Sequence, residues 1–183
     1  MKGNTSWDHM SDVQRRAIFE AGLTLHALQI TELQISFCLT WVFPKDANIR
    51  LRALFNAGAK HQKRTLGQLI AELRKRTEIA DNFDQLFADF INERNRFVHT
   101  LFSEHPYQLR SDAGAAKAIE FMLPLQEMAV IVQDTFHGHL VLWGQNSNDP
   151  DLQALSEQLI QAHPRLRRIA DEGHFKNHIR RRH

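Results

Sequence analysis

Apolar residues recur at steps of three and four along nearly the whole chain, which is the pattern of amphipathic helices. The first series predicts a helix that opens at the capping-box pattern of Ser11 and Gln14 and stops before Pro44. Its apolar positions are Leu25, Leu28, Ile35, Leu39 and Val42. Glycine is scarce and no pair of strands is joined by a hairpin signal, so we expect no sheet.

Later series predict further helices from Asp46 to a break near Gly58, and over about 62–76, 81–102, 113–143 and 150–163. The predicted helix at 62–76 should bury Leu66, Leu69, Ile70 and Leu73 on one side. The polar stretch QNSNDP at 145–150 is the clearest linker. We therefore expect an all-α bundle of about five or six helices over residues 10–145. Residues 146–183 should form a C-terminal helix and a basic tail that packs on the bundle or trails it.

Composition narrows the class of protein. The chain has 183 residues, ordinary hydrophobic content and one cysteine, Cys38, which excludes an internal disulfide framework. No apolar run is long enough to span a membrane and no secretory signal is present, which is compatible with a cytoplasmic protein. No glycine-rich phosphate loop occurs, so we expect no nucleotide cofactor of the P-loop or Rossmann kind.

The distribution of charge and the number of histidines raise the question of a polyanion and of a metal ion as ligands. Net charge is only +2, yet residues 45–76 hold nine Lys or Arg against two acids, and 163–183 hold seven against two. Such segments can contact a polyanion, although solvated helix faces have the same composition. The chain also has 11 histidines, including the pairs His137/His139 and His174/His178. A zinc site needs three or four converging ligands at a recognised spacing, and none is found, so we expect no metal.

The stretch FINERNRFVHTLF at 90–102 combines an apolar stripe with charged and polar residues. The stripe predicted to face the core contains Phe83, Leu86, Phe87, Phe90, Ile91, Arg94, Val98 and Leu101. On a regular helix Asn95 and His99 share a face, whereas Arg94 and His99 lie about 140° apart. Since an unpaired buried charge is costly, either Arg94 pairs within the bundle, for example with Glu32, or its stripe faces a cleft or another subunit.

Arginine and histidine together suit phosphate chemistry. The guanidinium matches a phosphate and stays charged, and imidazole exchanges a proton near neutral pH. RNA carries its own nucleophile, the 2′-hydroxyl, so a base and a cation suffice for cleavage without metal. An asparagine could hold the imidazole or a phosphate oxygen. A solvated or ion-paired helix face would show the same spacing by chance.

The pattern Arg94-Asn95-x-x-x-His99, late on an amphipathic helix of a small helical chain, resembles the signature of the HEPN superfamily (higher eukaryote and prokaryote nucleotide-binding). That signature is Arg, four to six residues, then His, often with a polar residue after the Arg. The resemblance implies a bundle that dimerises and joins two motifs into one site. One departure is Thr100, where many members have Gly; this residue could lengthen the helix past His99.

The resemblance implies a metal-independent endoribonuclease, a toxin or phage-defence component, with a composite site at a homodimer interface. Arg94, His99 and Asn95 would be its catalytic residues. RNA would be guided by four basic residues, Lys60, Lys63, Arg64 and Arg96. A cognate antitoxin protein is an implied partner. The alternative is a non-catalytic HEPN-like dimer that binds a partner protein or a nucleotide.

Overall fold

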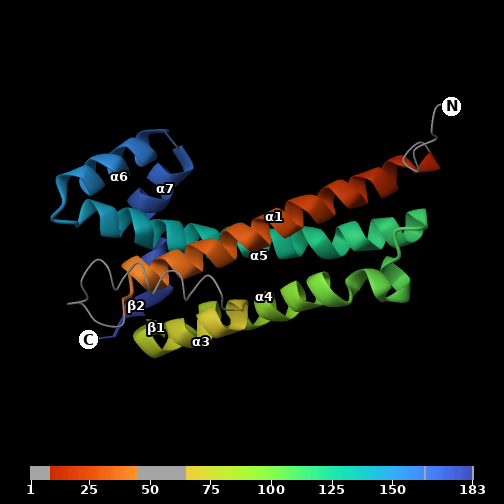
Figure 1. Ribbon diagram of the computed structural model, residues 1–183, viewed down its shortest axis with the longest axis horizontal. Helices are drawn as coiled ribbons and strands as arrows, with labels where there is room; N and C mark the ends of the chain where they lie inside the picture. Colours follow the sequence, from red (N-terminus) through yellow and green to blue (C-terminus); the bar gives the residue numbers. More distant parts are fainter. Residues whose placement is uncertain (1–8, 45–64, 163, 183) are drawn as a thin grey trace. The chain divides into compact units, whose positions relative to one another are not determined.

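The computed structural model describes residues 9–44, 65–162 and 164–182, which are mainly helical (Figure 1). The α-helices in this part of the chain are α1 (Asp12–Trp41), α3 (Leu66–Arg76), α4 (Asp81–His99), α5 (Asp112–Gln145), α6 (Pro150–Ala162) and α7 (Pro164–Glu172). Three 3₁₀ turns, η2 (Leu101–Ser103), η3 (His105–Tyr107) and η4 (His174–Asn177), and two strands, β1 (Thr77–Ile79) and β2 (Ile179–Arg181), complete it. The prediction of a mainly helical chain is confirmed. The helix predicted from Asp46 lies outside the described residues.

The chain divides into two compact units. The first unit comprises Met1–Gln29 and Phe90–Ala129, and the second comprises Ile30–Asp89 and Val130–His183. Helices α1, α4 and α5 each contribute residues to both units, whereas α3, α6 and α7 belong to the second alone.

Polar contacts fix the helix ends of the first unit. The predicted capping box is present, because the Gln14 backbone N–H donates to Ser11 Oγ and the Ser11 N–H donates to Gln14 Oε1. Ser11 Oγ also donates to Asp112 Oδ1 at 2.6 Å, which joins the start of α1 to the start of α5. Farther along, Gln126 Nε2 on α5 donates to Thr24 Oγ1 on α1 at 2.9 Å. The α1–α5 pair is thus held at two levels.

The second unit buries the stripe that the sequence predicts for α3. Leu66, Leu69, Ile70 and Leu73 are all buried, and Thr65 forms a capping box with Gln68 that begins this helix. Helix α6 packs closely on α5 at Gly144. A Cβ at this position would lie only 2.9 Å from the Ser156 Cβ, so the contact needs a glycine. The Ser156 hydroxyl donates to the Val141 carbonyl at 3.1 Å across the same contact. Pro150 begins α6, as the linker pattern predicts.

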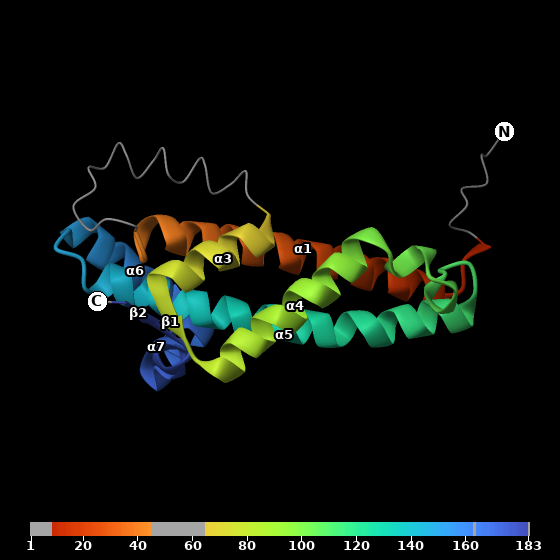
Figure 2. The same ribbon diagram turned by 90° about the horizontal axis from the view of Figure 1, so that it is seen from below.

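The C-terminal segment departs from the prediction. The sequence indicated no strand, yet β2 pairs antiparallel with β1, with Ile79 opposite Ile179 (Figure 2). Phe175 is buried against α5, where its ring fills the space that a Cβ on Gly138 would need. Each strand has three residues and its partner lies about a hundred positions away, so neither periodicity nor a hairpin signal could reveal them.

Arg76, at the end of α3, binds the C-terminal end of α1 within the second unit. Its Nη1 donates to the carbonyls of Leu39 at 2.7 Å and Phe43 at 2.9 Å, and its Nη2 donates to Glu72 at 2.7 Å. Leu39 lies in the last turn of α1 and Phe43 follows its end, where backbone acceptors lack intrahelical donors. A cation there also complements the helix dipole. Arg76 thus acts as a C-terminal cap supplied by another helix.

We predict that Arg76→Ala lowers the free energy of unfolding by about 2–3 kcal/mol, since it leaves the carbonyls of the buried residues Leu39 and Phe43 without a charged donor. The matched control is Lys75→Ala. Lys75 is adjacent, pairs with the same Glu72 at 3.9 Å and is 75% exposed, so its loss should cost under about 0.5 kcal/mol. Urea unfolding followed by circular dichroism measures both. Equal effects of the two substitutions would contradict the capping role.

Two histidines, the buried His139 and the half-buried His178, hold the C-terminal segment. His139 lies between the rings of Phe43 and Phe175, at 5.1 and 4.9 Å, and its Nε2 is buried without a hydrogen-bond partner among the described residues. Burial, and then the nearby charge of His178, lowers the pKa of His139 to about 4. His178 stacks on Phe83 at 4.6 Å, and burial lowers its pKa also. The His139 imidazole is therefore neutral at neutral pH when this segment is in place.

We predict that acid weakens this packing. An unfolded histidine binds its proton near pH 6.5, whereas folded His139 binds it only near pH 4, so the unfolded state binds more protons in between. The contribution of His139 to the free energy of unfolding is fully present above about pH 6.5. It is lost as the pH falls toward 4. Between pH 7 and pH 5 the thermal midpoint of His139→Leu should therefore fall less than that of the wild type. The exposed-residue control His105→Leu should follow the wild type. A His139→Leu variant with the wild-type pH dependence would contradict this account.

Candidate functional site

The candidate residues lie on the last two turns of α4, in the first unit. Asn95 and His99 are exposed and one helical turn apart, and His99 is the last residue of the helix. Arg94 is half-buried, and its Nη1 donates to Asn95 Oδ1 at 3.2 Å. This contact leaves the two Nδ2 hydrogens of Asn95 as donors for a ligand. The structure thus joins Arg94 to Asn95, while helix geometry turns His99 about 140° away from Arg94.

The core-facing stripe predicted for α4 is wrong at one position. Val98 is 41% exposed, whereas Phe97 is buried at 6%. Seven residues make almost two full helical turns, so Phe97 lies only about 20° from Phe90, while Val98 lies about 80° from it. Arg94 stands four residues after Phe90 and three before Phe97, and so remains on the core-facing side.

Val98 therefore joins Asn95 and His99 on the exposed side of α4. Phe102, in η2 directly after the helix, is 36% exposed. We call the surface made by Asn95, Val98, His99 and Phe102 the motif face. It combines two apolar side chains with an amide and an imidazole, and Arg94 contacts its edge through Asn95. A partner that covered this face would remove both apolar side chains from water.

Arg96 has a structural role in the loop after the motif. Its Nη2 and Nε donate to the two carboxylate oxygens of Glu104, at 2.7 and 3.2 Å. The guanidinium also lies 5.0 Å from the Tyr107 ring and 4.9 Å from the Phe121 ring. The hydrogen bond from Arg96 lowers the pKa of Glu104, and the same bond raises the pKa of Arg96. This bidentate pair fixes the path of the chain beyond His99.

Thr100 supports the same loop. Its Oγ1 donates to Glu104 Oε1 at 3.1 Å, and α4 ends at His99. The expectation that Thr100 lengthens the helix past His99 is therefore wrong. Glu104 was not predicted from the sequence as a partner of Arg96 and Thr100, because the turns η2 and η3 around it carry no periodic signal. The other residues proposed to guide RNA, Lys60, Lys63 and Arg64, lie outside the described residues.

The histidines in the described part of the chain contact other side chains and do not gather around a common point. Within residues 9–44, 65–162 and 164–182, no three histidine, cysteine or carboxylate side chains gather closely enough to hold a metal ion. His137 instead meets Gln34, with its Nε2 at 2.6 Å from the amide nitrogen. His178 Nδ1 meets Thr135 Oγ1 at 3.0 Å. These imidazoles serve contacts between helices and the C-terminal segment.

Comparison with protein families, with curated proteins and with solved structures finds no match to this chain. None of the helices in the described part is both long and apolar enough to cross a membrane. A functional proposal therefore rests on the residues of the motif face and on Arg94 beside it.

Proposed function

We propose that this chain is a metal-independent endoribonuclease of HEPN type, whose composite site forms when two copies meet through the motif face. The observation that carries the proposal is the Arg94–Asn95 pair at the edge of an exposed surface that also holds His99 and two apolar side chains. In a two-fold dimer the same patch meets its own copy. Residues that diverge on one helix can then converge, with Arg94 of one chain near His99 of the other.

The proposed reaction needs only groups of the protein and the RNA. The 2′-hydroxyl oxygen attacks the adjacent phosphorus as His99 removes its proton. The bond from phosphorus to the 5′-oxygen breaks, and an imidazolium returns a proton to that oxygen. The products are a 2′,3′-cyclic phosphate and a 5′-hydroxyl. One His99 acts first as the base and, once protonated, as the acid that returns this proton, so a single histidine at the site suffices.

Arg94 and Asn95 have complementary roles in this proposal. The guanidinium of Arg94 stabilises the negative charge that develops on the phosphate oxygens in the transition state. Asn95 accepts from Arg94 through Oδ1, which orients the guanidinium, and its Nδ2 can donate to a phosphate oxygen. The biological setting that fits is a toxin with a cognate antitoxin, or a phage-defence component.

We predict that His99→Ala and Arg94→Ala each reduce cleavage of labelled RNA in EDTA by at least about 100-fold while the helical content stays unchanged. The matched controls are His105→Ala and Arg110→Ala, exposed residues of the same unit outside the motif. RNA with 2′-deoxy sugars should not be cleaved. If both motif variants cut RNA like the controls, the mechanism is wrong.

The composite site has a separate test by complementation. Heterodimers that combine one Arg94→Ala chain with one His99→Ala chain retain one arginine and one histidine on different chains, so they should regain part of the activity. If both residues act within one chain, these heterodimers stay inactive. A wild-type dimer that cuts no RNA in EDTA would instead favour the alternative, a HEPN-like dimer that binds a protein or a nucleotide.

A further inference from the structure

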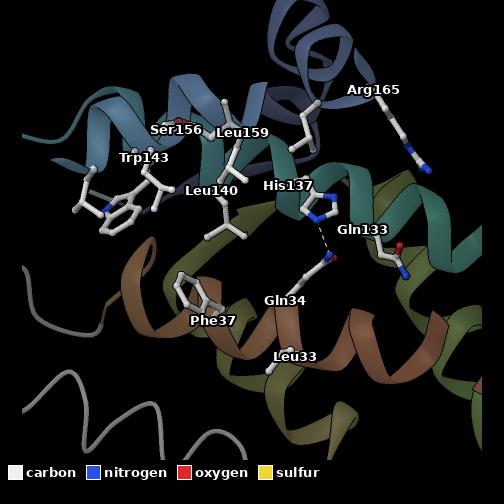
Figure 3. Close-up of a pocket in the computed structure, with 15 residues that line it drawn as sticks. Leu33, Gln34, Phe37, Gln133, His137, Leu140, Trp143, Ser156, Leu159 and Arg165 are labelled. Carbon is white, nitrogen blue, oxygen red and sulfur yellow. Dashed lines mark hydrogen bonds between the residues drawn. The ribbon is translucent and has the colours of Figure 1, made fainter. Parts of the chain in front are cut away.

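A cavity of about 660 Å³ lies within the second unit, far along the chain from the motif (Figure 3). Its walls come from the second halves of α1 and α5 and from α6 and α7. The side chains that form most of the wall are apolar: Leu33, Phe37, Leu140, Trp143, Leu155 and Leu159. This volume is in the range of sites for small organic molecules, about 300–1,000 Å³.

The apolar walls remain open to solvent. Leu155 and Leu33 are 51% and 52% exposed, and Phe37 and Leu159 are 45% and 43% exposed. Apolar side chains left in water cost free energy in proportion to their area, so a ligand that covers them gains that energy. Phe37 and Trp143 contribute aromatic rings to the wall, which favours an aromatic ligand.

A polar group lies at the base of the cavity. Gln34, which is 9% exposed, points across from α1 toward His137 on α5, as Figure 3 shows. The two Nε2 atoms are 2.6 Å apart, and the amide nitrogen can only donate, so His137 Nε2 accepts. The other amide atom, Gln34 Oε1, is buried and has no donor among the described residues. A buried acceptor without a donor is costly, so this oxygen selects a ligand that carries an N–H or O–H.

Charge at the rim further restricts the ligand. Arg165 is the one charged residue among the described residues that line the cavity, and its Nη2 binds Asp134 Oδ1 at 2.5 Å. Its charge is thus compensated by a carboxylate, and an anionic ligand would have to compete with that carboxylate. A neutral ligand needs no such exchange.

We propose that the cavity in the second unit binds a neutral aromatic molecule with a single hydrogen-bond donor. This group donates to Gln34 Oε1. The ring system lies between the leucines of α6 and the aromatic side chains Phe37 and Trp143. This site is separate from the motif face, and its test does not depend on RNA cleavage.

The test uses N-phenyl-1-naphthylamine, a neutral aromatic probe with one N–H whose fluorescence rises in apolar surroundings. We expect one probe per chain with micromolar affinity. Its sulfonated analogue, 8-anilinonaphthalene-1-sulfonate, has the same rings and N–H but a negative charge, and should bind at least about 10-fold more weakly. Equal affinity of the two probes, or no binding of the neutral probe up to its solubility, would overturn the proposal.

Variants test the location and the hydrogen bond. Leu159→Trp fills the cavity from an exposed position and should weaken binding at least about 10-fold, whereas Leu25→Trp, at a similarly exposed leucine of the first unit, should not. Leu155→Trp provides a second filling variant. Gln34→Leu should weaken the N–H probe about 10-fold and leave its N-methyl derivative unaffected, since that derivative has no donor to lose.

Two results would contradict the assignment. Equal effects of Leu159→Trp and Leu25→Trp would place the probe elsewhere. Self-association of the wild type that Leu159→Trp abolishes would show that a second copy, and not a small molecule, covers these leucines.

Discussion

An angular constraint on α4 governs every functional use of the motif. Phe90 and Phe97 are buried, so the helix must turn Arg94, which lies between them, toward the core-facing side. The same rotation exposes His99, about 140° from Arg94. One regular helix cannot aim both residues at one phosphate. The proposed site at one phosphate would therefore take a second copy of the helix, which would cover the exposed Val98 and Phe102.

Specific side-chain contacts hold the chain that follows the motif. Arg96 binds Glu104 with both arms of its guanidinium and lies over two aromatic rings, so the chain after His99 has a defined path. Several basic residues in the charged segments are likewise paired: Arg74 with Asp84, Arg76 with Glu72, Arg165 with Asp134, and Arg168 with Glu172. Counting charges along the sequence therefore overstates the basic surface that can meet RNA.

Sequence patterns predicted what depends on local periodicity. Three predicted features are present: the capping box at Ser11, the buried side of α3 and the linker before Pro150. Each of them depends on residues that are close together in the sequence. The motif was recognised by resemblance, and helix geometry alone gave the divergence of Arg94 and His99. Contacts between distant segments were missed: the pairing of β1 with β2, the return of Glu104 to Arg96, and the cavity beneath α6. Val98 was wrongly placed on the core-facing stripe. It follows Phe90 by eight residues, whereas an α-helix returns to nearly the same side after seven.

The most direct test of the central claim is crosslinking at the motif face. Cys38 is fully buried, and burial raises the pKa of its thiol, so an introduced cysteine would be the reactive one. Val98→Cys treated with a short bismaleimide should give a covalent dimer in high yield. Val130→Cys, at a valine of nearly equal exposure in the second unit, should not. A Val98→Cys chain that remains monomeric, or crosslinks no better than Val130→Cys, would contradict a site built by two chains.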